Sequence, residues 1–245
     1  MSDREIPSPG ELARHAYRKI EAEREALFRI GAIPVALQFL IAVLIGPLSQ
    51  SDPMLLVVAA LNMIPVTLFD VAWLRHLLRA AGGDPPLPYR WTRRHTGFAA
   101  RLAALYILMI IAAIPASFVA AIFPLTVIAL LAFLLGVVFF YAFLRFSLFF
   151  TARAFDQEIS LQQSWAATRD GAGRFFWGAA FSFLPGFIVL MIVFSIAKGT
   201  GFAAAFPLVT TLAASAVYYL CNALLLAVIA RVYEIRVTGF REAEF

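Results

Sequence analysis

The feature that most constrains the fold is a set of long apolar stretches that carry no charge. Residues 102–122 and 125–144 contain no Asp, Glu, Lys or Arg. Each stretch has about the 20 residues that an α-helix needs to cross the hydrocarbon core of a bilayer. Of all residues, 62% are hydrophobic and 14% are charged, against about 45–50% and about 25% in ordinary soluble domains. The sequence therefore predicts an all-α, polytopic integral membrane protein.

The apolar segments predict six transmembrane helices in a single membrane domain, residues 1–245. The expected spans are residues 27–48, 54–74, 98–122, 125–150, 175–197 and 206–230. Six spans of about 20 residues use roughly half of the chain and leave only connections and ends. Pro34, Pro115 and Pro185 recur in alternate spans, but proline is common in membrane helices. Whether the three hairpins are repeats therefore stays open.

The positions of the cations predict the orientation. Of the 20 Lys and Arg residues, 19 lie in the N-terminal segment, the two long connections and the C-terminal end, and only Lys198 lies in a short connection. Cytoplasmic segments carry such an excess of cations, so both termini are expected in the cytoplasm. The N-terminus lacks the pattern of a signal peptide, so we expect the first span to stay uncleaved.

Two short amphipathic helices are expected at the cytoplasmic surface of the membrane. The first, about residues 9–24, begins with Ser8 followed three residues later by Glu11, the spacing of a capping box. An apolar face then forms at the positions Leu12, Ala13, Ala16, Tyr17 and Ile20. Such a helix is suited to the membrane interface. The alternative is that this segment forms the first turns of a long first span.

The second amphipathic helix is expected over about residues 161–170. Ser160 and Gln163 have the spacing of another capping box, and Gly171 stands where a C-cap glycine is expected. Aromatic side chains prefer the headgroup layer. We therefore expect Tyr17, Trp91 and Trp165 to act as interfacial anchors.

The segment from Leu144 to Gly171 resembles a known membrane module. It contains Leu144-Arg145-Phe146-Ser147 at the end of a span, then Glu158, Ser160, Ser164-Trp165, Thr168 and Gly171. This layout, with the ending Tyr233-Glu234-Ile235-Arg236, is similar to the membrane domain attached to some glycerophosphodiester phosphodiesterases and to its stand-alone bacterial relatives. Thr151-Ala152-Arg153 stands where those relatives commonly carry a proline. The resemblance implies a six-helix module in a bacterial inner membrane, without phosphodiesterase activity because no catalytic domain is present.

The sequence offers no motif for catalysis, for a cofactor or for a metal. His15, His76 and His95 lack the spacing of metal ligands, and the single cysteine, Cys221, lies in an apolar run. No serine-hydrolase motif and no glycine-rich phosphate loop is found. Although the net charge is +5, the cations flank the spans instead of forming one tract, which argues against nucleic-acid binding.

Ionisable residues inside spans are costly and often functional. Asp70 lies about one turn inside the cytoplasmic end of its span, where a pairing with Arg145 would relieve the cost of burial. We therefore predict a polar cluster at the inner leaflet, made of Asp70, Arg145, Glu158, Arg231 and Glu234. It is either a set of structural ion pairs and topology signals or an entry for a lipid headgroup or an anionic solute.

These observations predict a non-enzymatic accessory or interaction protein in membrane or lipid homeostasis. The alternative is a small transporter or lipid-translocating protein that uses the predicted polar cluster. The expected partners are the bilayer, in particular anionic lipids of the inner leaflet, and another membrane protein or a second copy of the chain.

Overall fold

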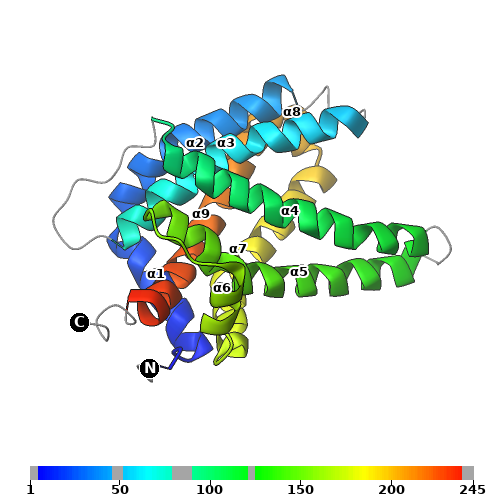
Figure 1. Ribbon diagram of the computed structural model, residues 1–245. Coiled ribbons are helices and arrows are strands. Elements are labelled where there is room, and N and C mark those ends of the chain that lie inside the picture. The colour runs from blue at the N-terminus through cyan, green and yellow to red at the C-terminus, as the bar shows by residue number, and fades with distance from the viewer. Residues whose placement is uncertain (1–4, 46–51, 79–89, 121–124, 239–245) are drawn as a thin grey trace.

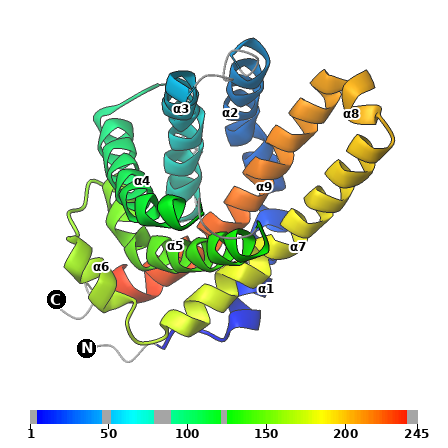
Figure 2. The ribbon, with the colours of Figure 1, turned by 90° about the vertical axis from the view of Figure 1, so that its right-hand side faces the viewer.

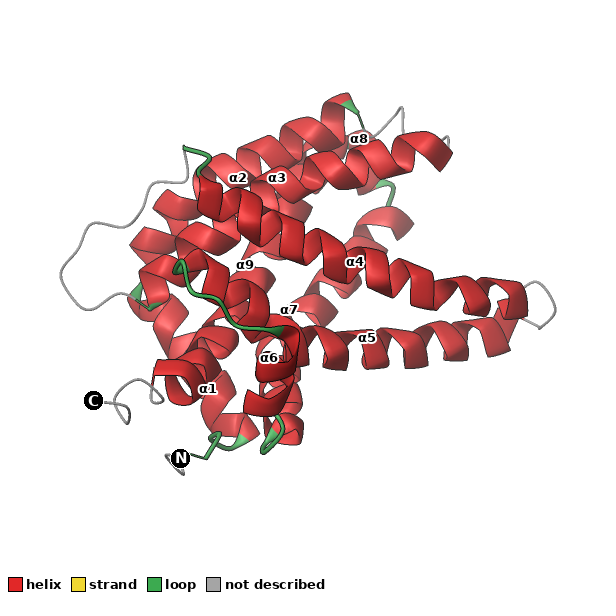
Figure 3. Ribbon diagram, viewed as in Figure 1, coloured by secondary structure: helices red, strands yellow, loops and turns green. Residues whose placement is uncertain are grey.

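The computed structural model describes residues 5–45, 52–78, 90–120 and 125–238; at 52–56, 109, 112–120 and 125 it describes the backbone alone. The connections 46–51, 79–89 and 121–124, which the sequence predicts as two outer links and one inner link, lie outside the described residues. Every regular element in the described part is helical (Figure 3). The elements are α1 (Pro9–Ala22), α2 (Arg24–Leu44), α3 (Asp52–Leu77), α4 (Arg93–Ala120), α5 (Leu125–Ala154), α6 (Leu161–Ala167), α7 (Ala172–Gly199), α8 (Phe202–Ala205), α9 (Pro207–Tyr233) and a π-helical turn (Glu234–Thr238).

The six predicted spans correspond to α2, α3, α4, α5, α7 and α9. Five of these, all but α4, are long and apolar enough within the described residues to cross a membrane. This arrangement of several apolar helices fits a membrane protein. Much of α4 lies outside the part whose side chains are described, so the sixth span stays a prediction.

The long helices form three hairpins, α2–α3, α4–α5 and α7–α9, which are joined at one end of the molecule (Figure 1). At this end, named here the packed end, lie α1, α6, the last turns of α3, α5 and α9, and the first turns of α4 and α7. Figure 2 shows that the hairpins spread apart toward the opposite end, named here the splayed end. The central helix is α9, which contacts α1, α2, α3, α5 and α7.

The hydrophobic core lies at the packed end. Its largest contributions come from residues 68–74 of α3, 144–154 of α5 and 223–233 of α9. Apolar side chains toward the splayed end are exposed instead, for example Phe133, with 67% of its surface accessible, and Ile192. Exposed apolar surface on this scale is unfavourable in water and favourable against lipid. The fold thus combines a closed core at one end with apolar helix surface at the other.

The first amphipathic helix is a separate element. Both hydrogen bonds of the predicted capping box are present, because Ser8 accepts from the backbone of Glu11 and the Glu11 carboxylate accepts from the backbone of Ser8. The chain leaves helical geometry at Glu23, between α1 and α2. The segment is therefore not the first part of one long helix. Leu12, Ala13 and Ala16 are buried, and α1 packs on α7 and α9.

The second short helix differs from its prediction at its end. The predicted Ser160–Gln163 capping box is present, but α6 ends at Ala167, earlier than the predicted end at residue 170. The hydroxyl of Thr168 bonds to the carbonyl of Ser164, and turns follow. Gly171 has a φ of +101°, a left-handed conformation that suits glycine. It stands at the N-cap of α7, so the predicted C-cap role is wrong.

Candidate functional site: polar contacts of the packed end

The N-terminal segment packs against two glycines, Gly171 at the N-cap of α7 and Gly178 within α7. A side chain at Gly171 would meet Ile6 at 3.0 Å, and one at Gly178 would meet Leu12 at 2.7 Å. Ile6 and Leu12 are each 1% exposed. Because glycine lacks a Cβ, the two segments approach more closely than other residues would allow. The N-terminal segment is therefore an integral part of the packed end.

Polar contacts fix the same two segments at both ends of this surface. Before α1, the Glu5 carboxylate accepts a hydrogen bond from Arg174 at 2.7 Å, and this contact lowers the pKa of Glu5. Farther along, the Tyr17 hydroxyl donates to the carbonyl of Ser182 at 2.8 Å. Tyr17, a predicted anchor, remains partly exposed, and burial of its ring raises its pKa.

Asp70 lies on the contact between α3 and α9. It is 6% exposed, and its carboxylate accepts a hydrogen bond of 2.6 Å from the side-chain amide of Asn222. One turn away, the Trp73 indole donates to the carbonyl of Ala223 at 3.2 Å. The Tyr219 hydroxyl, in turn, donates to Gln38 of α2 at 3.4 Å. Asp70 thus belongs to a polar seam between helices, and its partner is a neutral amide.

Arg145 fastens α6 to α5. Its guanidinium donates to the carbonyl of Trp165 at 2.6 Å and lies 4.1 Å from the centre of the indole ring. In return, its own backbone carbonyl accepts from the Ser164 hydroxyl at 2.8 Å. Arg145 is only 4% exposed. Its Nε has no hydrogen-bond partner among the described residues.

The predicted pairing of Asp70 with Arg145 is therefore wrong. Within the described residues no hydrogen bond or ion pair joins them, because Asp70 faces α9 whereas Arg145 faces α6. Arg231 and Glu234 do pair, at 3.0 Å, beside the C-terminal turn. Glu158 is 85% exposed at its side chain and lies 3.9 Å from Arg153. The five residues of the predicted polar cluster are thus distributed over separate contacts.

A set of contacts between the α4 and α5 regions is not predicted from the sequence. Arg94 forms an ion pair with Asp156, and Arg101 donates to the carbonyl of Phe149 at 2.6 Å. The Arg153 side chain crosses directly over Gly97, where an added Cβ would collide with its Nε. These residues are 48 to 62 positions apart in sequence. No local pattern marks such pairs.

The remaining predicted anchors lie on the surface of the packed end. The Trp91 indole donates to the Thr96 hydroxyl at 2.8 Å and is tilted against the His95 ring. Trp165 covers Arg145 and keeps 42% of its surface exposed. Their place at a headgroup layer remains a prediction.

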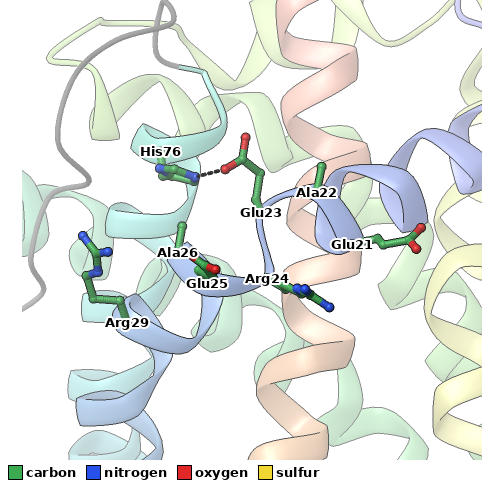
Figure 4. Close-up of a pocket in the computed structure, with 8 residues that line it drawn as sticks. All are labelled: Glu21, Ala22, Glu23, Arg24, Glu25, Ala26, Arg29 and His76. Carbon is green, nitrogen blue, oxygen red and sulfur yellow. Dashed lines mark hydrogen bonds and ion pairs between the residues drawn. The ribbon is translucent and has the colours of Figure 1, made fainter.

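A recess of about 650 Å³ lies at the junction of α1 and α2, and Figure 4 shows the residues that line it. The Glu23 carboxylate points to His76 of α3, and the two groups are 3.0 Å apart. Arg24 and Arg29 point away from this pair. Burial alone would raise the pKa of Glu23, but the contacts with His76 and Lys19 outweigh burial and lower it. The recess is therefore a polar joint between three helices.

A second recess, of about 480 Å³, lies between α1 and the end of α9. It is lined by Pro7, Glu11, Leu12, Arg14, His15, Arg18 and Arg231. Toward the splayed end, a groove of about 420 Å³ lies among α2, α7, α8 and α9. Its polar lining consists of Gln38, Thr210, Thr211, Ser215 and Tyr218.

None of the three histidines joins a metal site in the described part of the chain, where no group of three or more His, Cys, Asp and Glu side chains is arranged to hold a metal ion.

No protein family model, curated protein or solved structure matches this chain. The resemblance to the phosphodiesterase-associated membrane domain remains a prediction. Function must be argued from the geometry alone.

Proposed function

We propose that this chain is an integral membrane protein that acts without catalysis, as an accessory or interaction partner of other membrane components. The observation that carries the proposal is the contrast between the two ends. At the packed end, the deeply buried ionisable groups Asp70 and Arg145 are held by partners within the protein. At the splayed end, apolar side chains of α4, α5, α7 and α9 are exposed.

Asp70 accepts from Asn222, and Arg145 donates to the carbonyl of Trp165 and stacks on its indole, while only Nε of Arg145 lacks a described partner. Buried polar groups with such internal partners contribute to the structure. Helices in a bilayer associate through packing of their surfaces, because lipid tails are as apolar as the side chains. Hairpins that spread apart offer such surfaces to another membrane protein or to a second copy. The packed end then keeps the three hairpins together while the splayed end binds.

The proposal includes six spans, with α4 as the sixth, in a bacterial inner membrane. The termini, α1 and α6 lie in the cytoplasm, which agrees with the distribution of Lys and Arg. Topology is tested in a Cys221→Ala background with single cysteines at Arg90 and Lys198. Arg90→Cys should react with a membrane-impermeant maleimide only from the cytoplasmic side, and Lys198→Cys only from the other side. The reverse pattern would overturn the orientation.

The interaction role is tested by site-specific photo-crosslinking in native membranes. A photoreactive phenylalanine analogue replaces Phe133 or Ile192 at the splayed end, and Leu161 of α6 serves as the exposed control. We expect one discrete protein adduct of constant mass from the splayed positions and none from the control. Lipid adducts alone at every position would contradict an accessory role.

The groove lined by Gln38, Thr210, Thr211, Ser215 and Tyr218 favours transport as the second candidate. It brings polar side chains into an otherwise apolar region, and Asn222, the partner of Asp70, lies on the same helix one turn beyond Tyr218. In the Cys221→Ala background, a water path would make Ser215→Cys and Asn222→Cys react with a small charged thiol reagent. If Ser215→Cys reacts and Asn222→Cys does not, the groove ends before Asp70 and the accessory role is favoured.

A further inference from the structure

The recess between α1 and α9 is bordered by cations from two separate helices. On α1, Glu11, Arg14, His15 and Arg18 follow the spacing of three and four residues that places side chains on one helical face. The buried Ala16 lies on the opposite side of α1. Arg231 of α9 lines the same recess. The fold therefore brings Arg231 to Arg14 and Arg18, which lie more than 200 residues earlier in the sequence.

Few of the charges lining this recess are neutralised by neighbours. The Glu11 carboxylate is engaged in the capping box, where it accepts from the backbone and the hydroxyl of Ser8 at 2.9 and 2.8 Å. Arg231 is paired with Glu234, but its side chain remains 41% exposed. Arg14 and Arg18 are exposed, and for Arg14 the hydrogen bond to the Gly10 carbonyl engages only Nε. With Glu234, which pairs with Arg231, the recess and its border hold three cations and two anions, and Arg14 and Arg18 are the exposed cations of α1.

His15 lies among these charges and is half-buried. Burial lowers the pKa of His15, and the charges of Arg231 and Lys19 lower it further, while Glu234 opposes them. A neutral imidazole keeps one N–H donor and one acceptor. It can therefore donate a hydrogen bond beside the guanidinium groups.

From this geometry we propose that the recess between α1 and α9 binds the phosphate group of an anionic membrane lipid. Guanidinium groups match phosphate oxygens through paired N–H donors, and the recess of about 480 Å³ has room for a headgroup. Pro7 and Leu12 give part of the lining an apolar character, which suits the methylene groups of a lipid next to its phosphate. The inference rests on the proposed location of the packed end at the cytoplasmic leaflet, where anionic lipids attract cations.

The test uses the full chain purified in mild detergent and titrated with phosphatidylglycerol, with binding followed by native mass spectrometry. Arg14→Gln combined with Arg18→Gln removes two of the three guanidinium groups that line the recess, and the loss of these charge-assisted contacts should weaken phosphatidylglycerol binding by at least about tenfold. Arg169→Gln is the control, because Arg169 is also exposed at the packed end and lies outside the recess. Circular dichroism verifies that both variants are folded.

The design separates the lipid from a free anion. We expect one phosphatidylglycerol at fixed stoichiometry, weaker retention of phosphatidylcholine, and no displacement by millimolar inorganic phosphate. Equal retention by the double variant and the control would overturn the proposal, as would binding of inorganic phosphate in place of lipid. If the double variant loses the lipid and crosslinking at Phe133 is unchanged, lipid binding in the recess is supported independently of the accessory role. A failure of crosslinking with intact lipid binding would reject the accessory role alone.

Discussion

The seat of α1 on α7 can be tested by adding one methyl group. In Gly178→Ala, the new Cβ would lie 2.7 Å from Leu12 Cδ1 and 2.8 Å from Leu12 Cβ, closer than carbon atoms approach without displacement. Leu12 is 1% exposed, and its Cβ is held by the backbone of α1, so a change of rotamer alone does not remove the close contact. Overpacking of this kind costs about 1–3 kcal/mol. Against it stands the gain from replacing glycine by alanine in a helix, about 1 kcal/mol.

Gly136→Ala in α5 is the matched control. It is also a mid-helix glycine, but no heavy atom lies within 4 Å of the position of the added Cβ. The helix-propensity gain is common to both variants and cancels in the comparison. We therefore expect Gly178→Ala to be less stable than Gly136→Ala by about 1–3 kcal/mol.

The assay is unfolding in mixed micelles of dodecyl maltoside and sodium dodecyl sulfate, followed by circular dichroism. Leu12→Ala alone should cost about 2–5 kcal/mol, as for other buried leucines. Combined with Gly178→Ala it should cost less than the sum, because the added methyl occupies part of the space that the leucine leaves. Equal stabilities of Gly178→Ala and Gly136→Ala, or strict additivity in the double variant, would refute the close approach of α1 and α7.

Three further predictions concern the ionisable groups of the packed end. Arg145→Lys should detach α6, because an ammonium cannot both reach the carbonyl of Trp165 and stack on its indole. Trypsin should then cleave faster within residues 153–169. An unchanged cleavage rate would contradict the role of Arg145 in holding α6 on α5. Asp70→Asn should keep or raise the free energy of unfolding, since an amide oxygen still accepts from Asn222, whereas Asp70→Ala should lose about 1–3 kcal/mol. Unfolding in mixed micelles compares the two variants. Equal losses would refute the hydrogen bond between residues 70 and 222. The hydrogen bond and charge of Arg94 lower the pKa of Asp156, so this pair should stabilise the fold above the ordinary carboxyl pKa and lose its effect as pH falls through the lowered value. The contribution of this ion pair is below about 1 kcal/mol because both side chains are exposed. The free energy of unfolding should differ less between pH 7 and pH 3 in Asp156→Asn than in the unchanged protein. An identical difference in both proteins would argue against a stabilising ion pair.

The sequence predicts those parts of the fold that depend on neighbouring residues. The capping boxes at Ser8 and Ser160 are correct because their hydrogen bonds join positions three residues apart. Helix ends are less predictable. After Ala167 the chain tightens into turns, in which the Arg169 N–H donates to the carbonyl of Ala166, and the left-handed Gly171 then precedes α7.

The partners of the buried ionisable groups depend on contacts between distant segments. Asp70 and Arg145 lie near the same end of their helices, but a helix also fixes the direction in which each side chain points. Asp70 meets Asn222, which is 152 residues away, and Arg145 meets the short helix that follows its own span. Depth along a span is readable from composition. Rotation about the helix axis requires the packing partners to be known.

The residues that carry the family resemblance now have a physical role in this fold. Arg145, Ser164 and Thr168 converge on two backbone carbonyls, those of Arg145 and Trp165. A short helix of seven residues is too short to be stable alone, so α6 needs such contacts to hold its place against α5. The cation that composition alone marks as a candidate for ligand binding is thereby occupied in fixing the helix. A ligand is therefore expected at cations that remain exposed, and Arg14 and Arg18 of α1 meet that condition.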